Sequence, residues 1–331
     1  MIRIGRKILK LLLIFFMISV AAVIIWAFAN KLITVAETKN TLPIGQMITV
    51  DEKQMSIYTK GEGKHTIILM SGLGTTAPIL DFKPIIDKLS ETNKVVVVEP
   101  FGYGWSDLTD RERSVENIIS ELRDALEAAH IPGPYILMPH SISGIYATYY
   151  AETYPDEVSA IIGIDCTLPS QFQYFEQDKY TGVPNVAKLV CPLGISRLVT
   201  LISPEMFISQ NINGEYEDEN LQMQKKKSAW KGYISTVINE ANAINNNIEK
   251  TIDMSFDSNL PLLFFTIREQ SDNKRDDGKT SISFYETYIT NDSCQKVIEM
   301  DGKHYLHWNC SKEMCEEVNN FINNILNKSK E

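Results

Sequence analysis

The chain has 331 residues, of which 44% are hydrophobic and 22% are charged, a composition that excludes a disordered or collagen-like chain. The formal net charge is −10. Because an acidic surface repels phosphate backbones, we expect no binding of nucleic acids. The five cysteines are dispersed and form no CxxC pair, which predicts buried or half-buried thiols and gives no support to a metal site. Only Cys310 and Cys315, which are five positions apart, remain as candidates for a disulfide.

The N-terminal segment has the pattern of a membrane helix. Four basic residues precede position 11, and residues 11–29 contain no charged side chain. Nineteen residues in a helix rise about 28 Å, close to the thickness of the hydrocarbon core of a bilayer. We therefore expect residues 1–30 to form an uncleaved transmembrane anchor, in preference to a signal peptide cleaved near Ala29. Because basic residues stay on the cytoplasmic side, either alternative places the following residues outside the cytoplasm, anchored or secreted.

After residue 40, short apolar runs alternate with segments of helical spacing. In chain order we expect strands at 47–50, 54–59 and 66–70, a helix at 78–90, a strand at 95–98, a helix at 114–130, a strand at 135–138, a helix at 144–154 and a strand at 158–164. Helical stretches at 186–202 and 221–250 follow, and then strands at 262–267 and 295–300 and a helix at 312–327. This alternation predicts an α/β protein with a mostly parallel central sheet flanked by helices.

The break in the alternation predicts the domain organisation. Residues 169–258 show no clear buried strand, so we interpret them as a helical cap inserted after the sixth strand. Residues 40–168 and 259–331 then form a single core domain behind the N-terminal segment.

Two motifs follow strands of this sheet. Ser71-Gly72-Leu73-Gly74 comes directly after the third strand, where glycines allow a tight turn whose backbone N–H groups face a ligand. Pro139-His140-Ser141-Ile142-Ser143-Gly144 joins a strand to a helix. A serine on such a sharp turn is held exposed, and the helix N-terminus behind it favours developing negative charge. Ser141 is therefore the candidate nucleophile.

A nucleophilic serine needs a general base on a loop at the same edge of the sheet. Of the five histidines, His65 begins a strand at the opposite end, His130 ends a helix, and His140 adjoins the serine but points elsewhere in such a turn. His304 and His307 remain, and His304 lies in the loop that follows the last strand. We expect His304 to be the base.

These motifs together resemble those of the α/β-hydrolase superfamily, in its capped branch of serine hydrolases. Residues 99–107 (EPFGYGWSD) resemble its D-x-x-G-x-G-x-S segment, with Glu99 in place of the aspartate. Residues 150–158 resemble its helix-to-strand connection, and residues 302–304 resemble its G-x-G-H segment. The turn at Ser141 has P-x-S-x-S where the family has G-x-S-x-G. Most of the likeness lies in residues 67–168, and the cap matches no pattern.

The resemblance implies roles for individual residues. Ser141 matches the nucleophile and His304 the general base, and the backbone N–H groups of Leu73 and Ile142 match the oxyanion hole. The family places an acid after the strand that is 262–267 here, which makes Asp272 the first choice and Glu269 the second. In some relatives the acid follows the preceding strand, and that position is Asp165 here.

The reaction that these roles imply is hydrolysis of a carboxylic ester through an acyl-enzyme on Ser141, without a metal or an organic cofactor. Esters lead because they are the commonest substrates on this fold, and a peptidase or aminopeptidase is the alternative. A third alternative is an inactive, membrane-anchored ligand-binding protein, in case no acid reaches His304. The expected partners are a small ester or amide substrate and the membrane, but no nucleic acid.

Overall fold

A computed structural model describes residues 2–206, 208–269 and 275–327. Eight strands form one sheet in the order β1-β2-β4-β3-β5-β6-β7-β8. β1 and β2 pair antiparallel, β2 also runs antiparallel to β4, and all other neighbours are parallel. The strands are β1 (Gln46–Val50), β2 (Lys53–Lys60), β3 (Thr66–Met70), β4 (Lys94–Glu99), β5 (Tyr135–Pro139), β6 (Val158–Ile164), β7 (Leu262–Ile267) and β8 (Gln295–Met300). The predicted mostly parallel sheet is confirmed.

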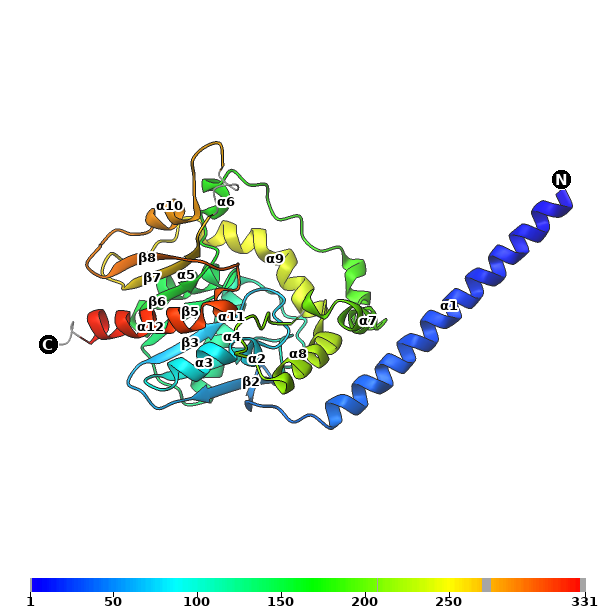
Figure 1. The fold of residues 1–331 in the computed structure, drawn as a ribbon, viewed down its shortest axis with the longest axis horizontal. Coiled ribbons are helices and arrows are strands. Elements are labelled where there is room, and N and C mark those ends of the chain that lie inside the picture. The colour runs from blue at the N-terminus through cyan, green and yellow to red at the C-terminus, as the bar shows by residue number, and fades with distance from the viewer. Residues whose placement is uncertain (1, 207, 270–274, 328–331) are drawn as a thin grey trace.

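Helices cover both faces of this sheet (Figure 1). One face packs against α3 (Lys83–Leu89) and α12 (Ser311–Phe321), and the other packs against α4 (Val115–Ala128), α5 (Ser143–Thr153) and α10 (Ser281–Glu286). The central strands are apolar on both faces because both faces are covered; β3 and β5, for example, are buried throughout. This packing fixes the carboxyl ends of β5, β6 and β8, from which the candidate site residues emerge.

Several predicted helices are divided in the structure. The stretch 78–90 forms α2 (Pro78–Asp81) and α3, and 221–250 forms α8 (Asp218–Lys231) and α9 (Ser235–Thr251). The second break falls at Gly232 and at Tyr233, whose positive φ of 58° cannot continue a right-handed helix. The stretch 186–202 contains a short 3₁₀ helix η2 (Asn185–Leu189) and α7 (Ile195–Ile202), and the last helix continues as the π-helix η5 (Ile322–Leu326). Short helices α6 (Gln171–Tyr174), α10 and α11 (Leu306–Asn309) were not predicted.

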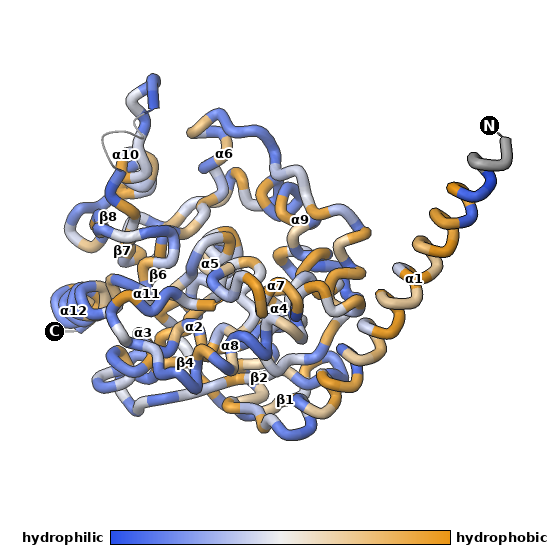
Figure 2. Tube along the Cα trace, turned by 45° about the vertical axis from the view of Figure 1, so that its right-hand side comes forward, coloured by the Kyte–Doolittle hydropathy of each residue, from blue (hydrophilic) through white to orange (hydrophobic). Residues whose placement is uncertain are grey.

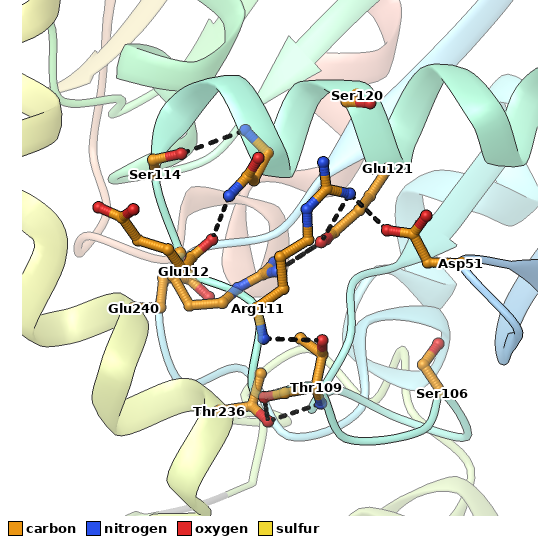
Figure 3. Close-up of polar contacts among 12 residues, drawn as sticks. Asp51, Ser106, Thr109, Arg111, Glu112, Ser114, Ser120, Glu121, Thr236 and Glu240 are labelled. Carbon is orange, nitrogen blue, oxygen red and sulfur yellow. Dashed lines mark hydrogen bonds and ion pairs between the residues drawn. The ribbon is translucent and has the colours of Figure 1, made fainter.

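We use the word cap for residues 169–258, in which the described part contains helices and no strand. Its helix α9 is joined to the core segment that leads into α4 (Figure 3). The backbone N–H of Thr109 donates to Thr236 Oγ1 at 3.1 Å, and this hydroxyl donates to the Thr109 carbonyl at 3.0 Å. Arg111 of the same segment forms an ion pair with Asp51. The segment thereby fastens α9 over the carboxyl edge of the sheet.

The helix α1 (Ile2–Lys39) is longer than the predicted 1–30 segment and projects from the body of the molecule (Figure 1). Its stretch Arg6–Lys39 has a mean hydropathy of 2.9 in its most apolar window, and this window is 0% buried. It is the one helix in the described residues that is long and apolar enough to cross a membrane or to serve as a signal sequence. The C-terminal part of α1 contacts the cap.

Candidate active site

Ser141 lies in a strained turn between β5 and α5. Its φ is +55°, in the left-handed region that side chains other than glycine rarely adopt, so the surrounding structure must hold this conformation. The turn is tightly packed: a Cβ on Gly144 would lie 2.4 Å from the Thr167 carbonyl oxygen, which leaves room only for glycine. The backbone N–H of Thr167 in turn donates to the Ser141 carbonyl at 2.7 Å. This packing presents the Ser141 hydroxyl at the carboxyl edge of the sheet.

His304 connects Ser141 with a carboxylate. Its Nε2 lies 2.9 Å from Ser141 Oγ, and its Nδ1 lies 2.7 Å from Asp165 Oδ2. Asp165 directly follows β6 and has a φ of +39°. The His304 side chain is 46% exposed, whereas that of Asp165 is only 14% exposed. The carboxylate is therefore largely shielded from solvent, while the imidazole is open to it.

The structure places the three candidate acids differently. Asp165, the alternative from the preceding strand, occupies the position next to His304 Nδ1. Asp272, the first choice, lies outside the described residues. The carboxylate of Glu269 accepts hydrogen bonds from the backbone N–H of Ser281 at 2.7 Å and from its hydroxyl at 3.0 Å, and thereby helps to fix the start of α10.

The glycine turn at residues 71–74 packs directly against Ser141. A Cβ on Gly72 would lie 3.0 Å from Ser141 Cβ, so any larger residue would push the two turns apart. Within the described residues, the backbone N–H groups of Leu73 and Ile142 donate to no protein acceptor. The next amide, that of Gly74, donates to the Tyr103 hydroxyl at 3.3 Å. Two N–H groups that donate to no protein acceptor in the described residues thus lie on the two turns that pack together at Ser141.

His140 contributes to the site although the sequence analysis set it aside. It is fully buried, and its Nε2 lies 3.1 Å from the backbone carbonyl oxygen of His304, to which it donates. Burial lowers the pKa of His140 well below its ordinary value, and the neighbouring His307 and His304 lower it further. His140 is therefore neutral and fixes the loop that carries the base. Only its position beside Ser141 hinted at this role.

A second buried group supports the same loop from the other side. Asp81, at the end of α2, is bound by His307 Nε2 at 2.7 Å, by Trp308 Nε1 at 2.8 Å and by the Ser209 hydroxyl at 3.0 Å. These contacts connect the loop after β8 with α2 and with the cap. Asp81 was missed because nothing in the sequence around it distinguishes it from an ordinary residue of a helix.

A cavity of about 370 Å³ lies beside His304. The core contributes Gly74, Tyr305 and Trp308 to its lining, and the cap contributes Met206 and Ile208. Such a size and mixed lining are typical of pockets for small molecules. No group of three or more His, Cys, Asp or Glu side chains that could hold a metal is found among the described residues, and their five cysteines are free thiols.

The comparisons with known proteins agree with this fold. No family model matches the chain. The Bacillus subtilis protein named uncharacterized protein YbdG is 29% identical over 269 residues, which cover 80% of this chain and 81% of that protein. A mutant of the Vigna radiata epoxide hydrolase has a TM-score of 0.64 at 16% identity, and it covers 84% of this chain and 98% of its own. The protein Cfl2 from Burkholderia cenocepacia has a TM-score of 0.62 at 16% identity, covering 83% and 94%. Such likeness shows the fold, and the predicted α/β-hydrolase fold is confirmed.

Proposed function

We propose that this chain is a capped serine hydrolase that cleaves carboxylic esters with Ser141, His304 and Asp165 as its catalytic triad. The observation that carries the proposal is the continuous hydrogen-bonded path from the Ser141 hydroxyl through both nitrogens of His304 to Asp165, at 2.9 and 2.7 Å. A nucleophile, a base and an orienting acid in this order define serine hydrolases on unrelated folds. We assign the acid to Asp165 because it already occupies the contact that Asp272 or Glu269 would need.

The geometry accounts for each step of the reaction. Ser141 Oγ attacks the ester carbonyl while His304 Nε2 accepts its proton, and Asp165 stabilises the imidazolium that forms. The negative oxygen of the tetrahedral intermediate is held by the free N–H groups of Leu73 and Ile142. The intermediate collapses when His304 returns the proton to the departing alcohol, which leaves the acyl group on Ser141. A water molecule then attacks this acyl-enzyme by the same steps and releases the acid.

The identity of the nucleophile favours esters over epoxides, although the structural neighbours are named epoxide hydrolases. Epoxide hydrolases of this fold use an aspartate nucleophile. Opening of an epoxide by a carboxylate gives an ester, which water can hydrolyse. Opening by Ser141 would instead give an ether, which has no carbonyl for water to attack, so the enzyme would be blocked after one turnover. A peptide bond would follow the same steps as an ester, with an amine in place of the alcohol.

We also propose that α1 remains attached as a membrane anchor, with the α/β-hydrolase domain outside the cytoplasm. Trp26 precedes the predicted cleavage position at Ala29, and its Nε1 donates to the Gly194 carbonyl of the cap at 3.3 Å. Asn30, one residue after that position, donates to the Cys191 carbonyl at 3.4 Å. The contact with the cap therefore continues across the cleavage position, which supports an uncleaved helix.

The test is covalent labelling of the full chain in detergent with a fluorophosphonate probe, followed by mass-spectrometric identification of the labelled peptide. We expect labelling at Ser141, its loss in Ser141→Ala, and a decrease of at least about 10³-fold in labelling rate in His304→Ala. His65→Ala, at the opposite end of the sheet, is the matched histidine control and keeps the wild-type rate. Labelling at another residue, or none in the folded chain, would refute the triad. A panel of esters and amides then separates an esterase from a peptidase.

A further inference from the structure

The cap helix α7 buries polar side chains and exposes apolar ones, the reverse of a surface helix in a soluble protein. Its hydroxyl side chains Ser196 and Thr200 are buried at 1% and 5% exposure, and Ser196 donates to the Ala229 carbonyl of α8 at 3.1 Å. On its outer side, Leu201 and Ile202 are 72% and 80% exposed. A surface helix of a soluble protein normally buries the apolar side and exposes the polar one. This arrangement therefore indicates that something apolar covers the outer side of α7.

The exposed apolar side chains extend beyond α7 to both ends. The apolar cap face comprises Leu189, Ile195, Leu198, Leu201, Ile202 and Met206, which are 39–80% exposed. Met206 is 65% exposed and also lines the cavity beside His304. The apolar cap face thus leads from η2 along α7 to the cavity beside His304.

The N-terminal helix α1 packs against the cap beside the apolar cap face. A Cβ on Gly194, just before α7, would lie 2.8 Å from both Asn30 Cβ and Trp26 Nε1, so the missing side chain allows α1 to approach closely. Arg197 then reaches along α1: its Nε donates to Asn30 Oδ1 at 2.8 Å, and its Nη2 forms an ion pair with Glu37 Oε2 at 2.7 Å. The start of α7 therefore lies level with Trp26 and Asn30, at the end of the uncharged stretch 11–29. Figure 1 shows α7 on the side of the body that faces α1, and Figure 2 shows the apolar stretch of α1 projecting away from the body.

From these observations we propose that the apolar cap face lies in the headgroup and upper acyl region of the bilayer and that the enzyme hydrolyses an amphiphilic ester with a long acyl chain, taken from the membrane. The inference rests on the proposed function and on α1 as an anchor. A bilayer crossed by residues 11–29 ends where Gly194 meets α1, so the adjoining face is brought to the lipid surface without further movement. Amphipathic helices bind this region with their apolar side inward. A lipid chain that leaves the bilayer along α7 meets Met206 and then the cavity beside His304.

The first experiment compares two substrates with the full chain reconstituted in phosphatidylcholine vesicles. A short, water-soluble ester reports the chemistry, and a long-chain acyl ester embedded in the vesicle reports access from the bilayer. For Leu201→Glu/Ile202→Glu we expect the ratio of bilayer to soluble turnover to fall at least about 10-fold, because charges oppose insertion of the face. The double variant Ile44→Glu/Leu108→Glu, which adds the same charge at exposed apolar positions of the core, is the matched control and keeps the ratio. An unchanged ratio in the cap variant would overturn the proposal.

The second experiment does not depend on turnover. An environment-sensitive fluorescent residue is incorporated at Ile202, and in a separate protein at Glu62 on the opposite end of the sheet, and quenching by nitroxide-labelled phosphatidylcholine is measured. We expect strong quenching at 202 and little at 62. Equal quenching would refute the membrane contact, and absence of quenching at 202 together with a dimer that Leu201→Glu/Ile202→Glu dissociates would show that a second copy covers the face. If the wild type hydrolyses neither ester but is quenched at 202, the proposed function fails while the contact holds.

Discussion

The sheet and the cap differ in the side chains that they leave exposed. The sheet buries its apolar residues on both faces and places Ser141 and Asp165 of the proposed triad at its carboxyl edge. The cap buries charged groups, with Lys227 at 2% and Glu240 at 4% exposure, and exposes Leu201 and Ile202. The apolar faces of the sheet are covered by its own flanking helices, whereas the exposed apolar side chains of the cap are covered, by our proposal, by the bilayer.

The largest effect is expected at the edge of the sheet, from Asp165→Asn. An amide in this place leaves the fold intact but favours the wrong tautomer of His304, because it can donate to Nδ1 instead of accepting from it. We expect kcat for a soluble ester to fall by about 10⁴-fold. Glu269→Gln is the control and should change kcat by less than about threefold, since the Glu269 side chain binds Ser281 at the start of α10 and an amide oxygen can still accept both hydrogen bonds there. If Glu269→Gln lost most of its kcat while Asp165→Asn stayed active, the assignment of Asp165 as the acid of the triad would be wrong.

The next effect concerns the contact between the two regions. The Tyr103 hydroxyl accepts from the Gly74 N–H at 3.3 Å and donates to Glu240 Oε2 at 2.9 Å, and Tyr146 donates to the other oxygen of Glu240 at 3.0 Å. Burial raises the pKa of Glu240, and the charge of Arg113 opposes this shift. The cap carboxyl thereby holds the turn that carries the Leu73 amide.

Removal of this hydroxyl in Tyr103→Phe should loosen the turn and lower kcat by about 10-fold, because an oxyanion donor that is lost altogether costs 10²–10³. KM for a soluble ester should change little, since Tyr103 does not hold the ground state. Tyr146→Phe, which leaves the Gly74 contact in place, is the control with nearly wild-type kcat. Equal losses in the two variants would mean that the tyrosines merely stabilise the cap.

The buried lysine of the cap gives a prediction on pH. Burial lowers the pKa of Lys227 to about 7, and the nearby carboxylate of Glu99 opposes this effect. In the unfolded chain the pKa of a lysine is about 10.4, so between pH 7 and 10 the unfolded state binds more protons and the free energy of unfolding rises with pH. Burial likewise lowers the pKa of Lys231 to about 8, so part of the rise belongs to Lys231.

In Lys227→Met the increase of the free energy of unfolding with pH should be smaller by up to about 1.4 kcal/mol per pH unit, which is the contribution of one proton. The measurement is the unfolding midpoint in detergent at pH 7, 8 and 9. Lys226→Met, an exposed neighbour on α8, keeps the wild-type slope. An unchanged slope in Lys227→Met would show that Lys227 keeps its proton in the folded chain over this range.

The sequence predicted the sheet better than the cap for the same physical reason. β3, β6 and β7 have the predicted bounds, because a strand buried on both faces must be apolar throughout. The break between α8 and α9 depends on a left-handed Tyr233, which no residue preference indicates. The motifs sufficed to bring Ser141 and His304 together, but the choice of acid depended on the direction of the His304 ring. That direction is set by packing around His140 and Asp81, which short motifs do not contain.

The smallest expected effect concerns the contact between α1 and the cap. Glu37 is held by Arg197 and by Trp230 Nε1, both at 2.7 Å. Burial acts to raise the pKa of Glu37, but these hydrogen bonds hold it below its ordinary value. Arg197→Met keeps the apolar part of the side chain and removes the ion pair together with the hydrogen bonds from Arg197 to Asn30 and Thr34. The ion pair in this half-buried place contributes about 1 kcal/mol.

We therefore expect amide hydrogen exchange in residues 30–39 of α1 to accelerate by about fivefold in Arg197→Met, since 1.4 kcal/mol corresponds to tenfold. Labelling of Ser141 by the fluorophosphonate probe should be unaffected. Lys179→Met, which removes the exposed ion pair with Glu249 elsewhere on the cap, is the control without effect on α1. If exchange in α1 does not change, the close approach at Gly194 and the remaining hydrogen bonds of Trp26, Asn30 and Glu37 hold the helix without the guanidinium of Arg197.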